Sequence, residues 1–254
     1  MTARVLVTRR AGSWPALTAR FEGTRIVLQL TPTTVQVAPL DPRPGDDAIG
    51  RLLSYDWLVL TSGHGVAALF RGLAARGVAG FPPGLRVAAV GPATTQALYS
   101  AGVGVALVAA DASSDGLAAS LGPQLKGGAR VLVVRPEGAP GSLAPALAAS
   151  GAVVDEAPLY RTIASEHARP LADEAIGGAF AAVVFTAPSA LELWLEAASD
   201  RRGLLVDALT RVARVAIGPT TSERLDSLGL PADATAAAPS EGAVGDAIEH
   251  VLRL

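Results

Sequence analysis

Hydroxyl side chains follow two short apolar runs, at the point where each run gives way to a helical pattern. Thr61 and Ser62 follow the first run, and Thr186 and Ser189 follow the second. A hydroxyl just before a helix accepts a hydrogen bond from the unpaired N–H groups of the first turn. Gly63 lets the backbone approach a ligand closely, and the N-terminus of a helix attracts anions. These residues are therefore predicted either to cap helices and do nothing more, or to bind an anionic ligand.

Two Gly-Pro turns lie between a second pair of apolar runs and the helical segments that follow them. The first turn contains Gly91 and Thr94, and the second contains Gly218, Thr220 and Thr221. Turns of this composition resemble those that cradle phosphates or carboxylates. Neither contains the G-x-x-x-x-G-K-[ST] pattern or the strict G-x-G-x-x-G pattern of nucleotide sites. A nucleotide is therefore disfavoured as the ligand.

Charged and polar side chains stand at further strand ends and helix starts. Arg9 and Arg135 end two predicted central strands, where each could bind a carboxylate or form a salt bridge at the edge of its sheet. His64 lies in the first turn after Ser62 and is either a solvated loop residue or an anion contact. Ser114 stands at a helix start, and either it or Ser113 is expected to be the cap.

Tyr160 lies near the end of a predicted strand at 153–162, where the chain passes between units. It could reach a binding cleft or only complete an amphipathic strand. No Ser/His/Asp nucleophile set and no glycosidase-like pair of carboxylates stands out. The sequence has no Cys, and its 3 histidines lack metal-ligand spacing. The residues alone therefore indicate no catalytic set, and Tyr160 stays a candidate for the cleft.

The composition narrows the classes of partner and location. Of 254 residues, 50% are hydrophobic and only 4% aromatic, so a core of Ala, Val and Leu is expected. A net charge of −2 without a marked basic cluster argues against nucleic acid. No uninterrupted apolar run of about 20 residues occurs, and the start does not read as a secretory signal. We therefore expect a cytoplasmic protein with no nucleic-acid or membrane partner.

Landmark residues recur in the same order in the two halves of the chain, about 126 positions apart. The pairs are Arg9 with Arg135, Thr61 with Thr186, Gly91 with Gly218, and Ser114 with Ser240. Short apolar runs that alternate with helical segments predict parallel sheets with helices on both faces. Ligands of such sheets bind at the carboxyl ends of the strands. We therefore predict two similar α/β units with Thr-, Ser- and Gly-lined rims, and expect the ligand in a cleft between the rims.

These motifs together resemble the uroporphyrinogen-III synthase family, over essentially the whole length of the chain. The segments that carry the resemblance are Val7-Thr8-Arg9, Tyr55-Asp56-Trp57, Thr61-Ser62, Val90-Gly91-Pro92 with Thr94, Ser114-Asp115-Gly116, 131–135, 151–162, Phe185-Thr186 and 217–221. Each segment is unspecific alone. Their order and spacing together are typical of the family.

The resemblance implies an α/β fold of two flavodoxin-like, three-layer, parallel-sheet domains joined by a two-stranded connector. The first domain would be discontinuous and would combine residues 1–38 with 164–254. The second would span 41–158, and the connector would consist of 37–40 and 159–163. The sequence repeat alone would also allow a simpler division near Gly127.

The resemblance also implies a reaction. The enzyme would be a cyclising hydro-lyase that converts hydroxymethylbilane to uroporphyrinogen III, with inversion of ring D and loss of water, in tetrapyrrole and heme biosynthesis. It would need no cofactor or metal. Apart from the resemblance, we expect a monomer. The linear substrate closes on its own to the wrong isomer, so the enzyme must mainly orient the chain.

Residue roles follow from the same resemblance. Tyr160 would act as the acid that assists loss of hydroxide, or it would only position the substrate. Residues of the strand-end rims would bind the carboxylates of the substrate, largely through main-chain N–H groups. These are Arg9, Thr61, Ser62, Gly63, His64, Gly91, Thr94, Ser114, Arg135, Thr186, Ser189, Gly218, Thr220 and Thr221.

Two other classes of function stay open at this point. One is an inactive two-domain cytoplasmic sensor that binds a small polycarboxylate ligand and closes on it. The other is a transferase that uses a nucleotide, which the missing phosphate loop disfavours.

Overall fold

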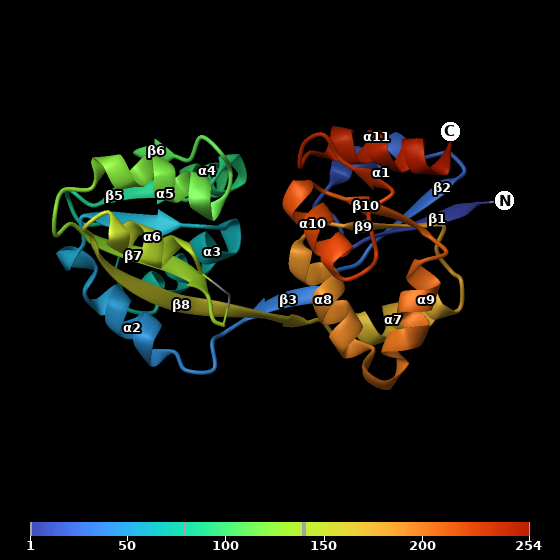
Figure 1. The fold of residues 1–254 in the computed structure, drawn as a ribbon, viewed down its shortest axis with the longest axis horizontal. Coiled ribbons are helices and arrows are strands. Elements are labelled where there is room, and N and C mark those ends of the chain that lie inside the picture. The colour runs from blue at the N-terminus through green and yellow to red at the C-terminus, as the bar shows by residue number, and fades with distance from the viewer. Residues whose placement is uncertain (1, 79, 139–140, 254) are drawn as a thin grey trace. The chain divides into compact units, whose positions relative to one another are not determined.

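The computed structural model describes residues 2–78, 80–138 and 141–253. Contacts divide the chain into two compact units (Figure 1). Unit 1 combines Met1–Val35 with Ile163–Leu254, and unit 2 spans Gln36–Thr162. Positions 1 and 254 of the expected first domain, and 79, 139 and 140 of the expected second, lie outside the described residues.

Unit 1 is a three-layer α/β unit. Its sheet has the order β2-β1-β9-β10-β11, and all neighbouring strands are parallel. The strands are β1 (Ala3–Val7), β2 (Ile26–Leu30), β9 (Ala182–Phe185), β10 (Ala213–Ala216) and β11 (Ala234–Thr235). The helices are α1 (Pro15–Phe21), α7 (Ala168–Ile176), α8 (Pro188–Ala197), α9 (Arg202–Leu209), α10 (Pro219–Ser227) and α11 (Glu241–Leu252), with a short 3-10 helix at Ser199–Arg201.

Alternation along each strand of unit 1 supplies both faces of the sheet with buried side chains. Val5 and Val7 join the core beneath α1 and α11, whereas Leu6 joins the core formed with α7, α8, α9 and α10. All three are fully buried. Because both faces are covered, the strands are nearly continuous apolar runs, as parallel sheets require.

Unit 2 contains the second sheet, of order β3-β8-β7-β4-β5-β6. The strands are β3 (Thr34–Val37), β4 (Trp57–Leu60), β5 (Arg86–Ala89), β6 (Leu107–Val108), β7 (Arg130–Pro136) and β8 (Val153–Ala164). The helices are α2 (Arg43–Gly50), α3 (Gly63–Ala74), α4 (Pro92–Ser100), α5 (Ser114–Leu121) and α6 (Leu143–Ala149), with 3-10 helices at Leu52–Ser54 and Gly122–Gln124. One core forms with α2, α3 and α4, and the other with α5 and α6.

The two sheets share one topology that is permuted between the units. In unit 1 the strand order, counted along the chain, is 2-1-3-4-5, which is the flavodoxin-like order. Apart from β3 at its edge, the sheet of unit 2 gives the same order when the count begins at β7 and continues through β8 to β4, β5 and β6. The repeat in the sequence also begins again at β7. A division near Gly127 would separate β4 from β7, which pair directly through Leu58 and Leu132.

The chain crosses between the units within β3 and again within β8. These two crossings are the two strands that the fold prediction requires between the α/β units. Fold class, parallel sheets and flavodoxin-like topology are therefore confirmed.

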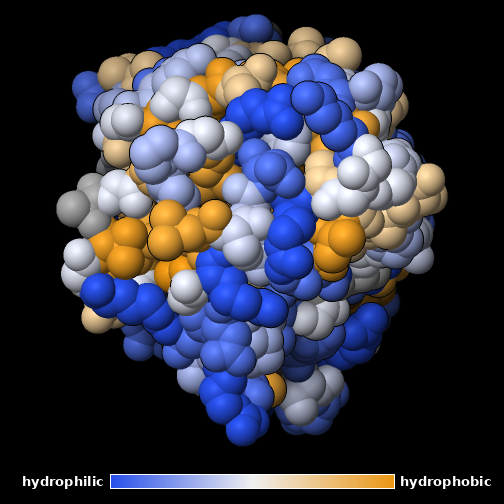
Figure 2. Space-filling view, turned by 90° about the vertical axis from the view of Figure 1, so that its left-hand side faces the viewer, coloured by the Kyte–Doolittle hydropathy of each residue, from blue (hydrophilic) through white to orange (hydrophobic). Residues whose placement is uncertain are grey.

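The face that Figure 2 shows is mainly hydrophilic, with hydrophobic side chains in separate groups. Among the residues that the structure describes, Leu53 and Leu40 are the most exposed large hydrophobic ones, at 84% and 77%. Within residues 2–78, 80–138 and 141–253, no helix is both long and apolar enough to cross a membrane.

Candidate functional site

The hydroxyl groups of Tyr160 and Ser62 meet at the carboxyl end of the sheet in unit 2. Their oxygen atoms lie 2.8 Å apart, and either hydroxyl can donate. Ser62 is also the N-cap of α3, because its Oγ accepts a hydrogen bond from the N–H of Gly65 at 3.0 Å. Tyr160 is only 4% exposed. The phenol hydroxyl is thus held at the N-terminal end of a helix, whose dipole favours anions.

A β-bulge precedes Tyr160 and sets its direction. Arg135 of β7 pairs with Pro158, but the next residue, Pro136, pairs with Tyr160. Leu159 is therefore an extra residue in β8, and bulges of this kind redirect the side chains that follow. Gly45 of α2 packs against the bulge, because a Cβ there would lie 2.5 Å from Leu159 Cδ2 and 3.2 Å from the carbonyl oxygen of Pro158.

Burial controls the protonation of Tyr160. Desolvation raises the pKa of its phenol above the ordinary value, and the hydrogen bond with Ser62 lowers it by a smaller amount. An ordinary tyrosine has a pKa of about 10 and a raised pKa keeps the proton in place, so this phenol is neutral at physiological pH. The exposed ring of His64 lies 6.3 Å from the Tyr160 ring, centroid to centroid. A protonated phenol at this position can donate a hydrogen bond to a leaving oxygen.

The residues beside Ser62 occupy the same turn. Thr61 Oγ1 donates to the carbonyl oxygen of Val134 in β7 at 3.4 Å, so it ties two neighbouring strand ends together. Gly63 and His64 form the first turn of α3 and are exposed. Main-chain N–H groups in the first turn of a helix have no partner within the helix. This turn therefore combines exposed backbone with the Tyr160 hydroxyl.

The Gly-Pro turn of unit 2 starts α4. Gly91 is buried and extended, and a Cβ there would lie 2.9 Å from the Cβ of Ala112. Thr94 is only 3% exposed, so its side chain is enclosed within unit 2. Any contact of this turn with a ligand would thus come from the backbone of the first helical turn.

The cap of α5 is Ser113, whose Oγ accepts from the N–H of Gly116 at 2.9 Å. Ser114 is the first helical residue and is half-buried. Arg135 forms a salt bridge with Glu156, with 2.5 Å between Nη1 and Oε1. Of the two alternatives for Arg135, the structure shows the salt bridge.

In unit 1 the ends of β1 and β9 are joined by two threonines. The N–H of Thr186 donates to Thr8 Oγ1 at 3.0 Å, and Thr186 Oγ1 donates to the carbonyl oxygen of Thr8 at 2.8 Å. The N-cap of α8 is Ala187, which has no side-chain acceptor. Thr186 therefore joins strands and does not cap the helix, and Ser189 lies half-buried in the first turn.

The second Gly-Pro turn and Arg9 complete the rim of unit 1. Gly218 is the extended N-cap of α10, followed by the exposed Thr220 and by Thr221, which is 3% exposed. The guanidinium of Arg9 stacks over the Trp14 ring at 4.5 Å. Its Nε donates to Ser13 Oγ at 3.2 Å, and burial lowers the pKa of Arg9.

The predicted residues thus form two groups, one at the carboxyl ends of each sheet. Within the groups, sequence reasoning missed Thr8, the partner of Thr186, and Leu159 and Gly45, which position Tyr160. Thr8 follows the apolar run of β1, as Thr61 follows that of β4, so the search for hydroxyl residues after apolar runs could have found it. In the part of the chain that the structure describes, no three His, Asp or Glu side chains are grouped as metal ligands would be.

Comparison with known families places most of the chain in one of them. The family model for uroporphyrinogen-III synthase HemD matches residues 19–245. A candidate uroporphyrinogen-III synthase from Methanothermobacter thermautotrophicus is 32% identical over 198 residues, which is 76% of each chain. The uroporphyrinogen-III synthase of Synechococcus elongatus is 28% identical over 226 residues, covering 86% of this chain and 83% of that protein.

Solved structures agree with the observed fold. A mutant uroporphyrinogen III synthase from Thermus thermophilus superposes with a TM-score of 0.70 at 24% identity and covers 99% of both chains. The Helicobacter pylori enzyme gives a TM-score of 0.58 at 18% identity, covering 100% of this chain and 99% of that one. These similarities support the two-unit α/β fold. They lend no support to the alternative of a ligand sensor.

Proposed function

Because this chain belongs to the uroporphyrinogen-III synthase family, a family of cyclising hydro-lyases, we propose that it converts hydroxymethylbilane to uroporphyrinogen III. The product requires closure of the ring with inversion of ring D and loss of water. The single observation that carries the proposal is the buried, protonated Tyr160, hydrogen-bonded to Ser62 at the start of α3.

The main task of the protein in this reaction is orientation. The linear tetrapyrrole closes by itself to the other isomer. The enzyme must therefore bring the carbon of ring D that gives the inverted product to the hydroxymethyl carbon faster than free closure occurs. Main-chain N–H groups at the starts of α3, α4, α5, α8 and α10 are suited to hold the carboxylates of the substrate. With a net charge of −2, the chain gives no general attraction for a polyanion. Local groups must therefore supply the binding.

Loss of water is the step that an acid assists. We assign to Tyr160 a hydrogen bond to the hydroxyl that leaves the hydroxymethyl carbon. The C–O bond breaks, the electron pair leaves with the oxygen, and a proton from the acid completes water. The attacking ring forms a C–C bond to the same carbon, and the proton lost on closure balances the one given to water. Ser62 holds the phenol oxygen in place and fixes the first turn of α3. The remaining predicted residues of the two rims contribute to binding in this proposal.

The proposal needs only one copy of the chain, because every assigned residue lies on it. We propose a cytoplasmic monomer, and sedimentation of the purified protein at micromolar concentration would test the oligomeric state.

The test of the function uses hydroxymethylbilane generated in place by the enzyme that makes it. Products are oxidised to porphyrins and their isomers I and III are separated. The proposal predicts that isomer III predominates when this protein is present. Isomer I alone, at the level of a reaction without the protein, would contradict it.

A further inference from the structure

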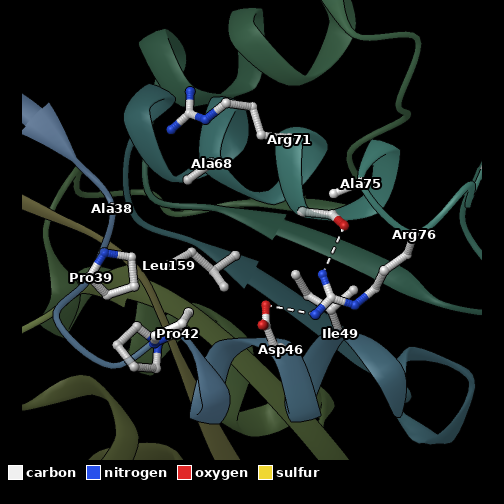
Figure 3. Close-up of a pocket in the computed structure, with 12 residues that line it drawn as sticks. Ala38, Pro39, Pro42, Asp46, Ile49, Ala68, Arg71, Ala75, Arg76 and Leu159 are labelled. Carbon is white, nitrogen blue, oxygen red and sulfur yellow. Dashed lines mark hydrogen bonds and ion pairs between the residues drawn. The ribbon is translucent and has the colours of Figure 1, made fainter.

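A pocket of about 540 Å³ lies in unit 2 between α2, α3 and β8 (Figure 3). This volume is in the range of small-molecule sites, about 300–1,000 Å³. Its described lining consists of Ala38, Pro39, Pro42, Asp46, Ile49, Ala68, Arg71, Gly72, Ala75, Arg76, Pro158 and Leu159. This set contains none of the residues assigned above to the reaction.

Most of the lining residues are apolar, and they come from parts of the chain that are distant in sequence. Pro39 lies in the segment that enters unit 2, Ile49 on α2, Ala68 on α3 and Leu159 in β8 (Figure 3). Ile49 is 4% exposed and belongs to the core of the unit. These side chains form an apolar surface that is fixed by the packing of α2 and α3 on the sheet.

Two arginines differ sharply in how they are paired. Arg76 forms a salt bridge with Asp46 at 2.6 Å and donates to the carbonyl oxygen of Gly72 at 3.0 Å. In Figure 3 the side chains of Arg76 and Asp46 lie together, and the guanidinium of Arg71 lies apart from them. Within the described residues the guanidinium of Arg71 has no hydrogen-bond or salt-bridge partner. The charged lining therefore carries one unbalanced positive charge.

From this arrangement we propose that the pocket binds a small amphipathic anion, namely a carboxylate attached to an apolar body. The apolar body lies against Pro39, Ile49 and Leu159, and the carboxylate pairs with Arg71. Guanidinium and carboxylate form charge-assisted, often bidentate hydrogen bonds. The inference does not rest on the proposed reaction, because binding is measured without tetrapyrrole.

Octanoate is the probe, and octylammonium is its matched cation with the same chain length. Isothermal titration calorimetry of the protein is expected to show saturable one-to-one binding of octanoate and no binding of octylammonium. Arg71→Ala removes the cation and is expected to weaken binding at least about tenfold, as loss of a charge-assisted hydrogen bond requires. Ala75→Trp places a large side chain on the exposed wall of the pocket and is expected to abolish binding.

Arg25→Ala is the control, because Arg25 is exposed in unit 1 and outside the pocket. It should leave the affinity unchanged. Because Leu159 is followed by Tyr160, the variant Tyr160→Phe separates the pocket from the neighbouring hydroxyl pair and should bind octanoate as the parent does. Equal binding of octylammonium, or affinity that is insensitive to Arg71→Ala, would overturn the proposal. Loss of octanoate binding in Tyr160→Phe would place the anion at the strand-end rim and would also overturn it.

Discussion

The phenol oxygen of Tyr160 lies 2.8 Å from the hydroxyl oxygen of Ser62, although 98 positions separate the two residues in the chain. One hydroxyl therefore serves two purposes. Ser62 satisfies a backbone N–H at the start of α3 and also holds the only phenol that we assign to the reaction. The stability of α3 and the position of the Tyr160 hydroxyl both depend on the Ser62 oxygen. Substitutions can separate the two effects.

Tyr160→Phe is expected to lower turnover by one or more orders of magnitude, because the variant keeps the ring and loses the proton donor. Folding should be retained, since the ring fills the same space. The measurements are the initial rate of formation of isomer III and thermal unfolding. Tyr99→Phe is the matched control, because Tyr99 is 55% exposed on α4. Turnover of Tyr160→Phe equal to that of Tyr99→Phe would remove Tyr160 from the mechanism.

Ser62→Ala is expected to have two effects of different origin. Loss of the cap should cost about 1 kcal/mol of unfolding free energy, and loss of the contact to Tyr160 should reduce turnover. Ser62→Thr keeps a hydroxyl that can cap the helix, and it should restore most of the stability. Denaturant unfolding and rate assays on both variants separate the effects. A stable Ser62→Ala variant with parental turnover would show that the hydroxyl serves neither purpose.

The stability at alkaline pH should depend on Tyr55. Its hydroxyl donates to Asp155 Oδ2 at 2.6 Å, and burial, followed by this hydrogen bond, raises the pKa of Tyr55 to about 12. An unfolded tyrosine titrates at about 10. Because the pKa is raised on folding, the contribution is complete below pH of about 10 and is lost as the pH rises toward about 12.

Tyr55→Phe therefore provides the matched comparison. At pH 8 the variant should be less stable than the parent by about 1–3 kcal/mol, as loss of a hydrogen bond to a charged group implies. The difference should shrink between pH 10 and 12 in urea unfolding. A difference that stays constant over this range would contradict the assignment of the raised pKa to Tyr55.

Gly45 is expected to support the bulge that positions Tyr160. In Gly45→Ala the new Cβ would meet Leu159 and the carbonyl oxygen of Pro158, so the bulge must shift. We expect a loss of about 1–3 kcal/mol of stability and a fall in the rate constant for turnover that exceeds any change in KM. Gly50→Ala, at the end of the same helix, meets nothing within 4 Å and should be neutral or slightly stabilising. Equal turnover of the two variants would remove Gly45 as a positioning residue.

Local patterns predicted the strands and their ends, because burial on both faces of a parallel sheet makes each strand an apolar run. The pairing of β4 with β7 has no local signal, since partners in a parallel sheet are set by topology. The repeat alone left open where the chain divides into two units, and the resemblance to a family supplied a division. Both units then have the same strand order, counted from β1 in unit 1 and from β7 in unit 2.

The same limit applies to the site. Ser62 was predicted as a cap because its signal lies within a few residues, and the structure shows that cap. Thr186 stands at the equivalent strand end, but the position before α8 is Ala187, and Thr186 bonds to Thr8 across the sheet. The contact of Tyr160 with Ser62 depends on an extra residue in β8. The local sign of that bulge is Pro158, because proline within a sheet is confined to edge strands, strand starts and bulges.

The isomer ratio of the product shows whether this protein directs the cyclisation. Hydroxymethylbilane is generated at a fixed rate, and the concentration of this protein is varied. The account predicts that the fraction of isomer III rises with protein concentration toward completion while isomer I falls. A fraction of isomer I that stays at its uncatalysed value at every protein concentration would contradict it.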